Sequence, residues 1–190
     1  MEKRARIIGA ARALFAQQGF AETTTQQVAA AADIGTGTLF LYVKSKEDLL
    51  ALVFKDEMQA TAIDSFKKLP PDTALVDQIL TVFDRMIEYH EKDLDLARVL
   101  IKEIAIPASA ERAADLNDLV ETIMMGFADL VRTAQSNGSL PRALEPMLTA
   151  RTIFAIYYFD LVGWLGNVHS RDDFLKGLRS QLELLLDRPA

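Results

Sequence analysis

The chain has 190 residues, among which there is no cysteine and there are only two histidines. Without cysteine the protein can form no disulfide framework, no thiolate metal site and no cysteine nucleophile, and this fits a reducing compartment. His90 and His169 stand apart near the ends of predicted helices, where histidines are usually surface or C-terminal capping residues. No set of His, Asp and Glu has the spacing of metal ligands, so we expect neither a metal nor a cofactor.

Other signals of catalysis and of membranes are also missing. No serine lies in a nucleophile-elbow setting and no glycine-rich loop has the pattern that cradles phosphates, so an enzyme has little support. The best candidate for a membrane span is interrupted by Asp160, Gly163 and Gly166 and is too short to cross a bilayer. The N-terminus has the pattern of a charged amphipathic helix and not of a signal peptide, so we expect a cytoplasmic protein.

Charge is distributed unevenly along the chain, whose net charge is −6. Residues 1–46 carry six Lys or Arg against three acidic residues, a net +3, whereas residues 47–190 carry 15 against 24, a net −9. A mildly basic head on an acidic body suits a protein that touches phosphate with one end only. We predict two domains, a DNA-binding head at residues 1–46 and a helical body at residues 47–190.

Residues 24–50 have the pattern of a helix-turn-helix. Thr24 and Gln27 form a predicted capping box at the start of its first helix. Asp33 and Gly35 flank the turn, where Asp tolerates a tight conformation better than most residues. A narrow stripe of small apolar residues lets this helix pack closely against its neighbours: Val28, Ala29 and Ala32.

The second helix of this motif is predicted at residues 36–42, with Leu39 and Val43 pointing inward. Ser45 and Asp48 form another predicted capping box, which opens the next helix. The spacing therefore predicts a three-helix head, since residues 3–18 read as a first helix that stops at Gly19.

The same stretch resembles the signature of the TetR (tetracycline-repressor-like) family of bacterial transcriptional regulators. The residues that carry the resemblance are Gly37, Thr38, Leu39, Phe40, Leu41, Tyr42, Val43, Lys46, Glu47 and Leu49, preceded by Ile7, Ala10, Ala11, Leu14, Phe15, Gly19 and Phe20. The resemblance covers about residues 5–54, and beyond it only the chain length and the helical pattern agree. It implies an inducer held among the middle helices of the body and a dimer formed by the last two helices.

The sequence departs from the family pattern at four positions. The family usually has Gly at Asp33, Ser or Thr at Gly35, Lys or Arg at Thr36, and Tyr at Phe40. Without the cation at position 36 and the tyrosine hydroxyl at position 40, the chain lacks phosphate or guanine contacts. The resemblance therefore implies the docking mode but not the operator sequence.

We predict that the outward face of the second helix enters the major groove of DNA. Gly37 permits close backbone approach, the Thr36 hydroxyl can bond base edges, and Phe40 can touch thymine methyls. Gln26, Tyr42, Lys46 and the Thr24 cap are candidates for base or phosphate contacts. The predicted DNA-binding residues are Thr24, Gln26, Gly35, Thr36, Gly37, Thr38, Phe40, Tyr42 and Lys46. The alternative is an ordinary helical hairpin with a partly exposed aromatic residue.

The body also reads as helices, which gives about nine in the chain and an all-α fold class. A connecting helix begins after Ser45 and ends before Pro70, and further helices begin near Asp72, Leu94, Ser109, Pro146 and Ser170. The fold predicted is an N-terminal three-helix helix-turn-helix head followed by a C-terminal helical ligand-binding and dimerisation domain.

The last two predicted helices bear on the oligomeric state. Apolar residues cover nearly the whole circumference of the helix at residues 147–165, so it must be buried on several sides. Either both helices form the core of a monomer, or they form a two-fold helical bundle between subunits, which the resemblance also implies. The candidate dimer-interface residues are Phe154, Tyr158, Leu161, Val162, Leu165, Phe174, Leu178, Leu182 and Leu185.

Aromatic and methionine residues are frequent in the body. Most such residues form plain core, but Met also lines adaptable apolar pockets and Tyr or Trp provides a polar handle. The candidate ligand-binding residues are Phe83, Met86, Tyr89, His90, Met124, Phe127, Phe154, Tyr157, Tyr158 and Trp164. A cationic ligand could instead pair with Glu103 or Asp160, although a salt bridge within the protein explains such carboxylates equally well.

The sequence thus predicts a homodimeric, ligand-responsive DNA-binding transcriptional regulator. We expect a repressor that a small apolar or aromatic effector releases from a pseudo-palindromic operator of double-stranded DNA. The alternatives are a helical adaptor or ligand-sequestering protein that does not read DNA and, with less support, a small α-helical enzyme.

Overall fold

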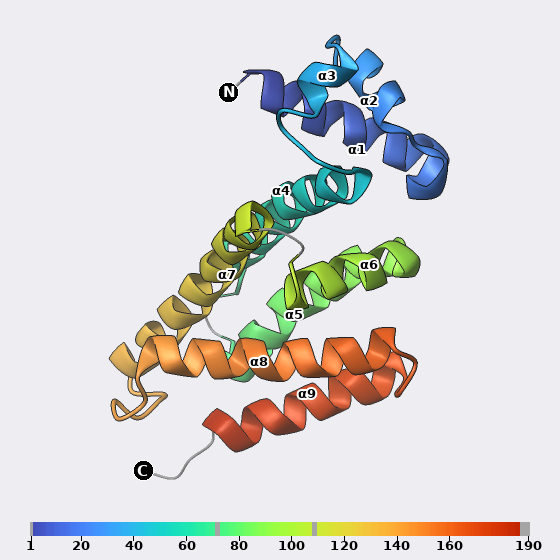
Figure 1. The fold of residues 1–190 in the computed structure, drawn as a ribbon. Coiled ribbons are helices and arrows are strands. Elements are labelled where there is room, and N and C mark those ends of the chain that lie inside the picture. Colours follow the sequence, from blue (N-terminus) through green and yellow to red (C-terminus); the bar gives the residue numbers. More distant parts are fainter. Residues whose placement is uncertain (1, 71–72, 108–109, 187–190) are drawn as a thin grey trace. The chain divides into compact units, whose positions relative to one another are not determined.

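The computed structural model describes residues 2–70, 73–107 and 110–186 (Figure 1). Within these ranges the chain forms nine α-helices and no β-strand, which confirms the all-α prediction. The helices are α1 (Glu2–Glu22), α2 (Thr25–Ala31), α3 (Thr36–Leu39), α4 (Lys46–Lys67), α5 (Leu75–Glu91), α6 (Leu94–Ala105), α7 (Ala110–Ser136), α8 (Pro146–Leu165) and α9 (Arg171–Leu186). The predicted caps Asp72 and Ser109 lie outside the described residues.

The helices group into two compact units. The head unit comprises Met1–Glu57 and Lys102–Leu116, and the body unit comprises Met58–Ile101 and Asn117–Ala190. Helix α4 belongs to both, because residues 46–57 lie in the head unit and residues 58–67 in the body unit. The domain boundary at residue 46 stays a prediction, since it was placed on charge and motif alone.

Small aliphatic residues form the core cluster of the head unit. The buried members on α2 are valine and alanine, so α2 can approach α1 closely. The first turns of α4 complete the cluster with Leu49, Leu52 and Val53. The remaining buried members are Ile7, Ile8, Ala11, Val28, Ala29, Ala32, Leu39 and Val43.

Helix α1 changes direction at Gly19, whose φ of 81° and ψ of 163° are not helical. An L-residue rarely adopts this conformation, whereas glycine does so without a steric penalty. The Thr23 hydroxyl then donates to the Gly19 carbonyl at 2.8 Å. The predicted stop of the first helix at Gly19 is therefore confirmed, with one short turn following it.

Local capping starts two of the longer helices as predicted. Before α4, the Asp48 carboxylate accepts from Ser45 N at 3.0 Å while Asp48 N donates to Ser45 Oγ at 3.2 Å. Before α9, Asp173 N donates to Ser170 Oγ at 3.1 Å. Such caps satisfy backbone groups that the first helical turn leaves without partners.

In the body unit α8 and α9 lie side by side and run antiparallel (Figure 1), and α5 also packs against α9. Arg171 of α9 pairs with Asp84 at 3.0 Å and Glu91 at 2.6 Å, and Arg179 pairs with Asp77 at 2.8 Å. These pairs fix the register of α5 and α9, although their exposure and screening by salt limit what each contributes to stability. None of the described helices is long and apolar enough to cross a membrane.

Candidate functional site

The first helix of the helix-turn-helix, α2, begins at a reciprocal cap. Gln27 N donates to Thr24 Oγ1 at 3.2 Å, and Thr24 N donates to Gln27 Oε1 at 2.8 Å. This confirms the predicted capping box. The cap sets the direction in which the chain enters α2, and Gln26 in the first turn of that helix is exposed.

The turn between α2 and α3 is held from two sides. Asp33 has a φ of 52°, a left-handed conformation that Asp tolerates better than most residues. Ile34 N donates to the Ala29 carbonyl at 3.0 Å, and the Arg6 guanidinium of α1 donates to the Asp33 carbonyl at 3.1 Å. Arg6 therefore fixes the turn that aims α3.

We call residues 36–42 the recognition segment. Its α-helix, α3, is shorter than the predicted helix over the whole segment. Regular α-helix ends at Leu39, and turns continue as Tyr42 N and Val43 N both donate to the Leu39 carbonyl, at 2.9 Å and 3.2 Å. The side chain of Leu39 is fully buried and that of Val43 is 4% exposed, so their predicted inward orientation is confirmed. Packing of these two residues fixes which face of the segment points outward.

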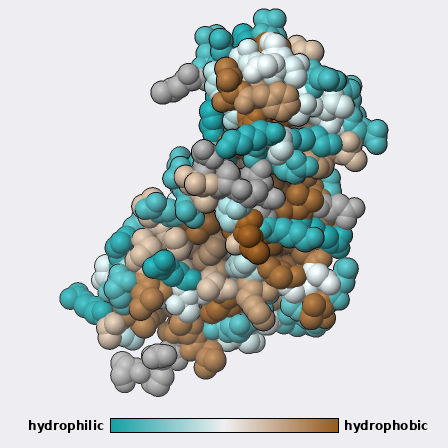
Figure 2. Space-filling view, in the orientation of Figure 1, coloured by the Kyte–Doolittle hydropathy of each residue, from teal (hydrophilic) through white to brown (hydrophobic). Residues whose placement is uncertain are grey.

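That outward face is formed by Gly37 and by Phe40 and Leu41, which lie three and four residues after it. Phe40 is 47% exposed, Leu41 is 83% exposed, and the neighbouring Tyr42 is 44% exposed. Figure 2 shows hydrophobic residues among hydrophilic ones on the surface of the head unit. The arrangement leaves a compact apolar face with hydroxyl groups at its margins, since Thr36 and Thr38 are half-buried.

The side chain of Lys46 has partners within the protein. Its Nζ donates to the Phe20 carbonyl at 2.8 Å and the Ala21 carbonyl at 3.0 Å, and it lies 4.4 Å from the centre of the Phe20 ring. These contacts join the start of α4 to the end of α1. An ammonium group has three donors, and two of those of Lys46 are used within the protein, while its predicted contact with DNA stays a prediction.

At least three of the six basic residues at positions 1–46 have protein partners. Besides Lys46 and Arg6, the Arg12 guanidinium pairs with Glu57 at 2.9 Å. The charge available for phosphate is thus smaller than the count of Lys and Arg suggests. Binding of a polyanion by one head alone would be weak, because affinity for DNA grows with the number of phosphates neutralised.

Three of the predicted ligand-binding residues form the centre of the body core. The rings of Phe83 and Tyr157 stack in parallel with centres 4.1 Å apart, and Phe83 meets Phe127 at 4.8 Å. All three side chains are at most 1% exposed. These rings pack against one another where α5, α7 and α8 meet.

Two polar side chains of the body unit, Tyr157 and His90, are buried. The Tyr157 hydroxyl has no hydrogen-bond partner among the described residues, and burial raises its pKa. Burial also lowers the pKa of His90 to about 4. His90 lies in the last turn of α5 but is only 3% exposed, so of the two expectations, a surface or a C-terminal capping histidine, the first is wrong for this residue.

The other ligand candidates are spread around this centre. Tyr158 donates its hydroxyl to the Ile101 carbonyl at 3.0 Å, and Trp164 stacks on Phe174 with ring centres 5.9 Å apart. The remaining candidates are buried or half-buried on α5, α7 and α8: Met86, Tyr89, Met124 and Phe154. Their assignment to a ligand site stays a prediction.

The carboxylate and histidine candidates have partners of their own. Asp160 accepts from the Gln181 side chain of α9 at 2.7 Å, and its carbonyl bonds the ring of His169 at 2.9 Å. The side chain of Glu103 lies outside the described residues. Among those described, no three His, Asp or Glu side chains are grouped as metal ligands would be.

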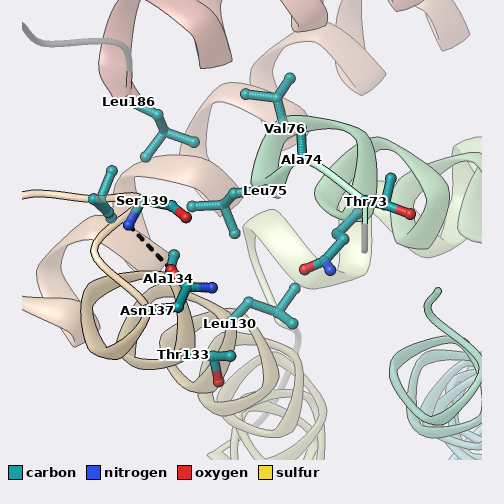
Figure 3. Close-up of a pocket in the computed structure, with 12 residues that line it drawn as sticks. Thr73, Ala74, Leu75, Val76, Leu130, Thr133, Ala134, Asn137, Ser139 and Leu186 are labelled. Atoms are coloured by element: carbon teal, nitrogen blue, oxygen red, sulfur yellow. Dashed lines mark hydrogen bonds between the residues drawn. The ribbon is translucent and has the colours of Figure 1, made fainter. Parts of the chain in front are cut away.

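A pocket of about 270 Å³ opens elsewhere in the body unit, where α5 begins and α7 ends (Figure 3). In this view Leu75 of α5 projects between Leu186 and the last turn of α7, and the dashed line marks Ser139 N donating to the Ala134 carbonyl at 2.8 Å. No pattern in the sequence indicates this pocket, since its walls come from three distant segments. None of the predicted ligand-binding residues lines it.

The residues predicted for a dimer interface differ in their exposure within this chain. Five of the nine predicted residues are at most 4% exposed within their own chain and have no surface left for a partner: Leu161, Leu165, Phe174, Leu178 and Leu182. The apolar residues that do face outward are Leu148, Ala155, Phe159 and Val162 on α8 and Leu184 on α9. Of the predicted set, Val162 belongs to this outward stripe, and Phe154, Tyr158 and Leu185 are half-buried.

Known proteins share both the motif and the whole fold. Residues 7–53 match the family model described as bacterial regulatory proteins, tetR family. The repressor KstR of Rhodococcus jostii is 26% identical over 97% of this chain and 83% of its own length. The fatty acid metabolism regulator protein of Bacillus subtilis is 23% identical over 95% of this chain and 92% of its own. The crystal structure of Thermus thermophilus FadR with lauroyl-CoA has a TM-score of 0.75 at 25% identity, and covers 98% of this chain and 97% of that one.

The exposed recognition segment on an all-helical body, with these relatives, defines a DNA-binding transcriptional regulator. The head carries the family match, and the relatives and the fold extend the likeness over almost the whole chain. The chain belongs to the TetR family of bacterial regulatory proteins.

Proposed function

We propose that the chain is a homodimeric repressor that holds a pseudo-palindromic operator with two recognition segments and leaves it when an apolar effector binds in the body. The observation that carries the proposal is the exposed face of Gly37, Phe40 and Leu41, opposite the buried Leu39 and Val43. A helix-turn-helix presents such a face to the major groove, and a two-fold dimer reaches half-sites about one helical turn apart.

The proposed DNA contacts fall into two groups. Thr36, Gly37, Thr38 and Phe40 face base edges, while Thr24, Gln26, Gly35 and Tyr42 lie where phosphates and sugars flank the groove. Lys46 is removed from the phosphate contacts because its Nζ already donates to two carbonyl groups. We propose that it positions the head on α4 instead, within a DNA-binding domain at residues 1–46.

Salt dependence separates these roles for Lys46. Loss of a phosphate contact lowers the slope of log affinity against log salt by about 1. Lys46→Ala should therefore weaken operator binding and head stability without changing this slope. Tyr42→Phe should weaken binding to all sequences equally, whereas Thr36→Ala should alter the preference for bases. If the slope falls with Lys46→Ala, Lys46 contacts a phosphate after all.

The proposed dimer interface is the outward stripe of α8 and α9. On α8 the residues 148, 155, 159 and 162 recur at helical spacing, and Phe159 is 76% exposed. Figure 2 shows hydrophobic residues in the part of the view where α8 and α9 lie. A two-fold axis would pair each stripe with its copy and form a four-helix bundle.

Sedimentation tests the stripe directly. Phe159→Glu places two charges at the centre of the proposed bundle and should give a monomer that no longer binds the operator tightly. Val168→Glu is the matched control, since Val168 is 79% exposed and lies outside the stripe. A dimer that persists with Phe159→Glu would reject this interface.

The chemistry of the effector is proposed from relatives and from the body core together. One relative is named a fatty acid metabolism regulator, and another was solved with lauroyl-CoA. Phe83, Phe127 and Tyr157 offer the apolar surroundings that a fatty acyl chain requires. We propose a long-chain acyl-CoA as the effector class.

Binding of an acyl chain would require these rings to part. They pack against one another, and the pocket of about 270 Å³ lies elsewhere and is at the lower limit for a drug-sized ligand, roughly 300 to 1,000 Å³. A shift in the body core would be felt by α4, whose second half belongs to the body unit. An effector that prefers the released state by about 3 kcal/mol would weaken operator binding roughly 10²-fold.

One series of measurements tests the proposal. Purified protein selects duplexes from a random library, and fluorescence anisotropy follows the enriched duplex with lauroyl-CoA or, as the control, with CoA alone. We expect a pseudo-palindrome, steep salt dependence and release by lauroyl-CoA only. If the folded, dimeric protein enriches no duplex, the helical adaptor is favoured instead. If lauroyl-CoA leaves operator affinity unchanged, the proposed effector class is rejected.

A further inference from the structure

The recognition segment exposes unusually little polar chemistry for a DNA-reading element. Residues 36–42 contain no Arg, Lys, Asn, Gln, Asp or Glu. In the major groove, guanine is read chiefly by Arg or Lys, adenine by Asn or Gln, and cytosine by a carboxylate. The segment therefore lacks the side chains that make bidentate contacts to these three bases, and its hydroxyl groups discriminate weakly.

What the segment exposes is apolar surface. Leu41 is 83% exposed and Phe40 is 47% exposed, next to each other on the face that also holds Gly37. The only apolar group that base pairs present in the major groove is the C5-methyl of thymine. Gly37 has no atom within 4 Å of an ideal Cβ position, so the backbone on this face is open to close approach.

Three of the six basic side chains at positions 1–46 are held by partners within the protein and do not compensate for this composition. Arg6 donates to the Asp33 carbonyl, Arg12 pairs with Glu57, and Lys46 donates to the Phe20 and Ala21 carbonyls. Each would have to leave a protein partner before it could read guanine. Gln26 of α2 is exposed and adds a possible adenine contact outside the segment.

From this we infer that the protein reads its operator mainly through thymine methyl groups, with Leu41 as a specificity-determining residue beside Phe40. The inference rests on the proposed function, because it states which bases the same helix reads. Each half-site then contains at least one thymine whose methyl group packs against Leu41, and guanine contributes little at the positions that face residues 36–42.

Deoxyuridine provides the test, because it removes the methyl group of thymine and leaves the hydrogen-bonding edge unchanged. Each thymine of the selected operator is replaced singly by deoxyuridine, and affinity is measured by anisotropy without effector. Burial of one methyl group corresponds to about a fourfold change in affinity. We expect a loss of about this size at one or two positions in each half-site of the wild-type complex.

The variant Leu41→Ala identifies the side chain responsible. It should bind the thymine operator more weakly, and it should no longer distinguish thymine from deoxyuridine at the sensitive position, since the two changes remove the same contact. Ile106→Ala is the matched control, because Ile106 is 82% exposed and lies outside the recognition segment. This control should keep both the affinity and the thymine preference of the wild type.

Three outcomes would overturn the inference. Wild-type affinity could be indifferent to deoxyuridine at every position, or Leu41→Ala could retain the full thymine preference. If the wild type binds a selected operator and either result follows, this inference fails while the proposed function stands. If no duplex is enriched at all, the proposed function fails, and this inference fails with it because it depends on that function.

Discussion

The head and the body of this protein are both helical but have different cores. The core cluster of the head contains only aliphatic side chains among its buried members, and local caps define where its helices begin. The body core centres on the stacked and tilted rings of Phe83, Phe127 and Tyr157, which come from three helices. Short-range signals thus predominate in the head and long-range packing in the body, so mutations should affect the two units differently.

The largest effect is expected from removing a ring at the centre of the body core. Phe127 is fully buried and contacts both Phe66 and Phe83. Phe127→Ala should lower the free energy of unfolding by about 3 to 5 kcal/mol, because it loses apolar burial and leaves a cavity. Urea unfolding followed by circular dichroism measures the change.

The control for this variant lies on the same helix. Met125 is 47% exposed, so Met125→Ala should cost less than about 1 kcal/mol. Similar losses for the two variants would mean that the ring cluster is not the centre of body stability.

A pH-dependent effect of the body is expected from His90. Its pKa in the folded protein, about 4, lies below the ordinary value of 6.5. Between these pH values the unfolded chain therefore binds a proton at His90 that the folded protein does not bind. Stability is unaffected by this group above about pH 7 and falls as pH decreases from about 6.5 towards 4, by up to about 3 kcal/mol. Unfolding at several pH values should show a shallower slope for His90→Gln. Equal slopes would mean that His90 does not hold a depressed pKa.

A smaller loss is expected where α4 meets α7 within the body unit. Gln59 of α4 donates to Thr122 of α7 at 3.1 Å, and an ideal Cβ at Gly126 would lie 2.3 Å from the ring of Phe66. Gly126→Ala should cost about 1 to 3 kcal/mol through overpacking. It should also change operator affinity although the head is untouched, because α4 continues into the head unit.

A compensating variant makes this prediction specific. Phe66→Leu removes the ring that the new methyl group meets, so the double variant should regain part of the lost stability and operator affinity. Additive losses in the double variant would show that Gly126 and Phe66 do not pack against each other where α4 meets α7.

The smallest effect is expected from the cap of the head. Thr24→Ala removes the Oγ1 that accepts from Gln27 N and should cost about 1 kcal/mol. Thr24→Ser keeps an acceptor and should restore most of the stability. Thermal unfolding measures both, and a loss with Thr24→Ser as large as with Thr24→Ala would show that the side-chain bond contributes little.

The comparison of the two units also explains what could be predicted. The caps at Thr24, Ser45 and Ser170, the stop at Gly19 and the turn at Asp33 follow from patterns a few residues long. Lys46 could not be placed this way, since its partners lie 25 and 26 residues away in the chain. The sequence pattern showed only that Lys46 lies near a DNA-binding motif. In the folded protein its ammonium group donates to carbonyl groups at the end of α1, which compete with phosphate for it.

The sequence by itself determined the helices, several of their caps and the class of DNA-binding head, because hydrophobic period and capping chemistry act over one or two turns. Tertiary structure alone decided that the aromatic rings of the body pack against one another and that Phe159, not Leu161, faces outward on α8. A helix that is apolar around its whole circumference has no intrinsic inner face. Its orientation is chosen only when α9 and α5 bury one side of it.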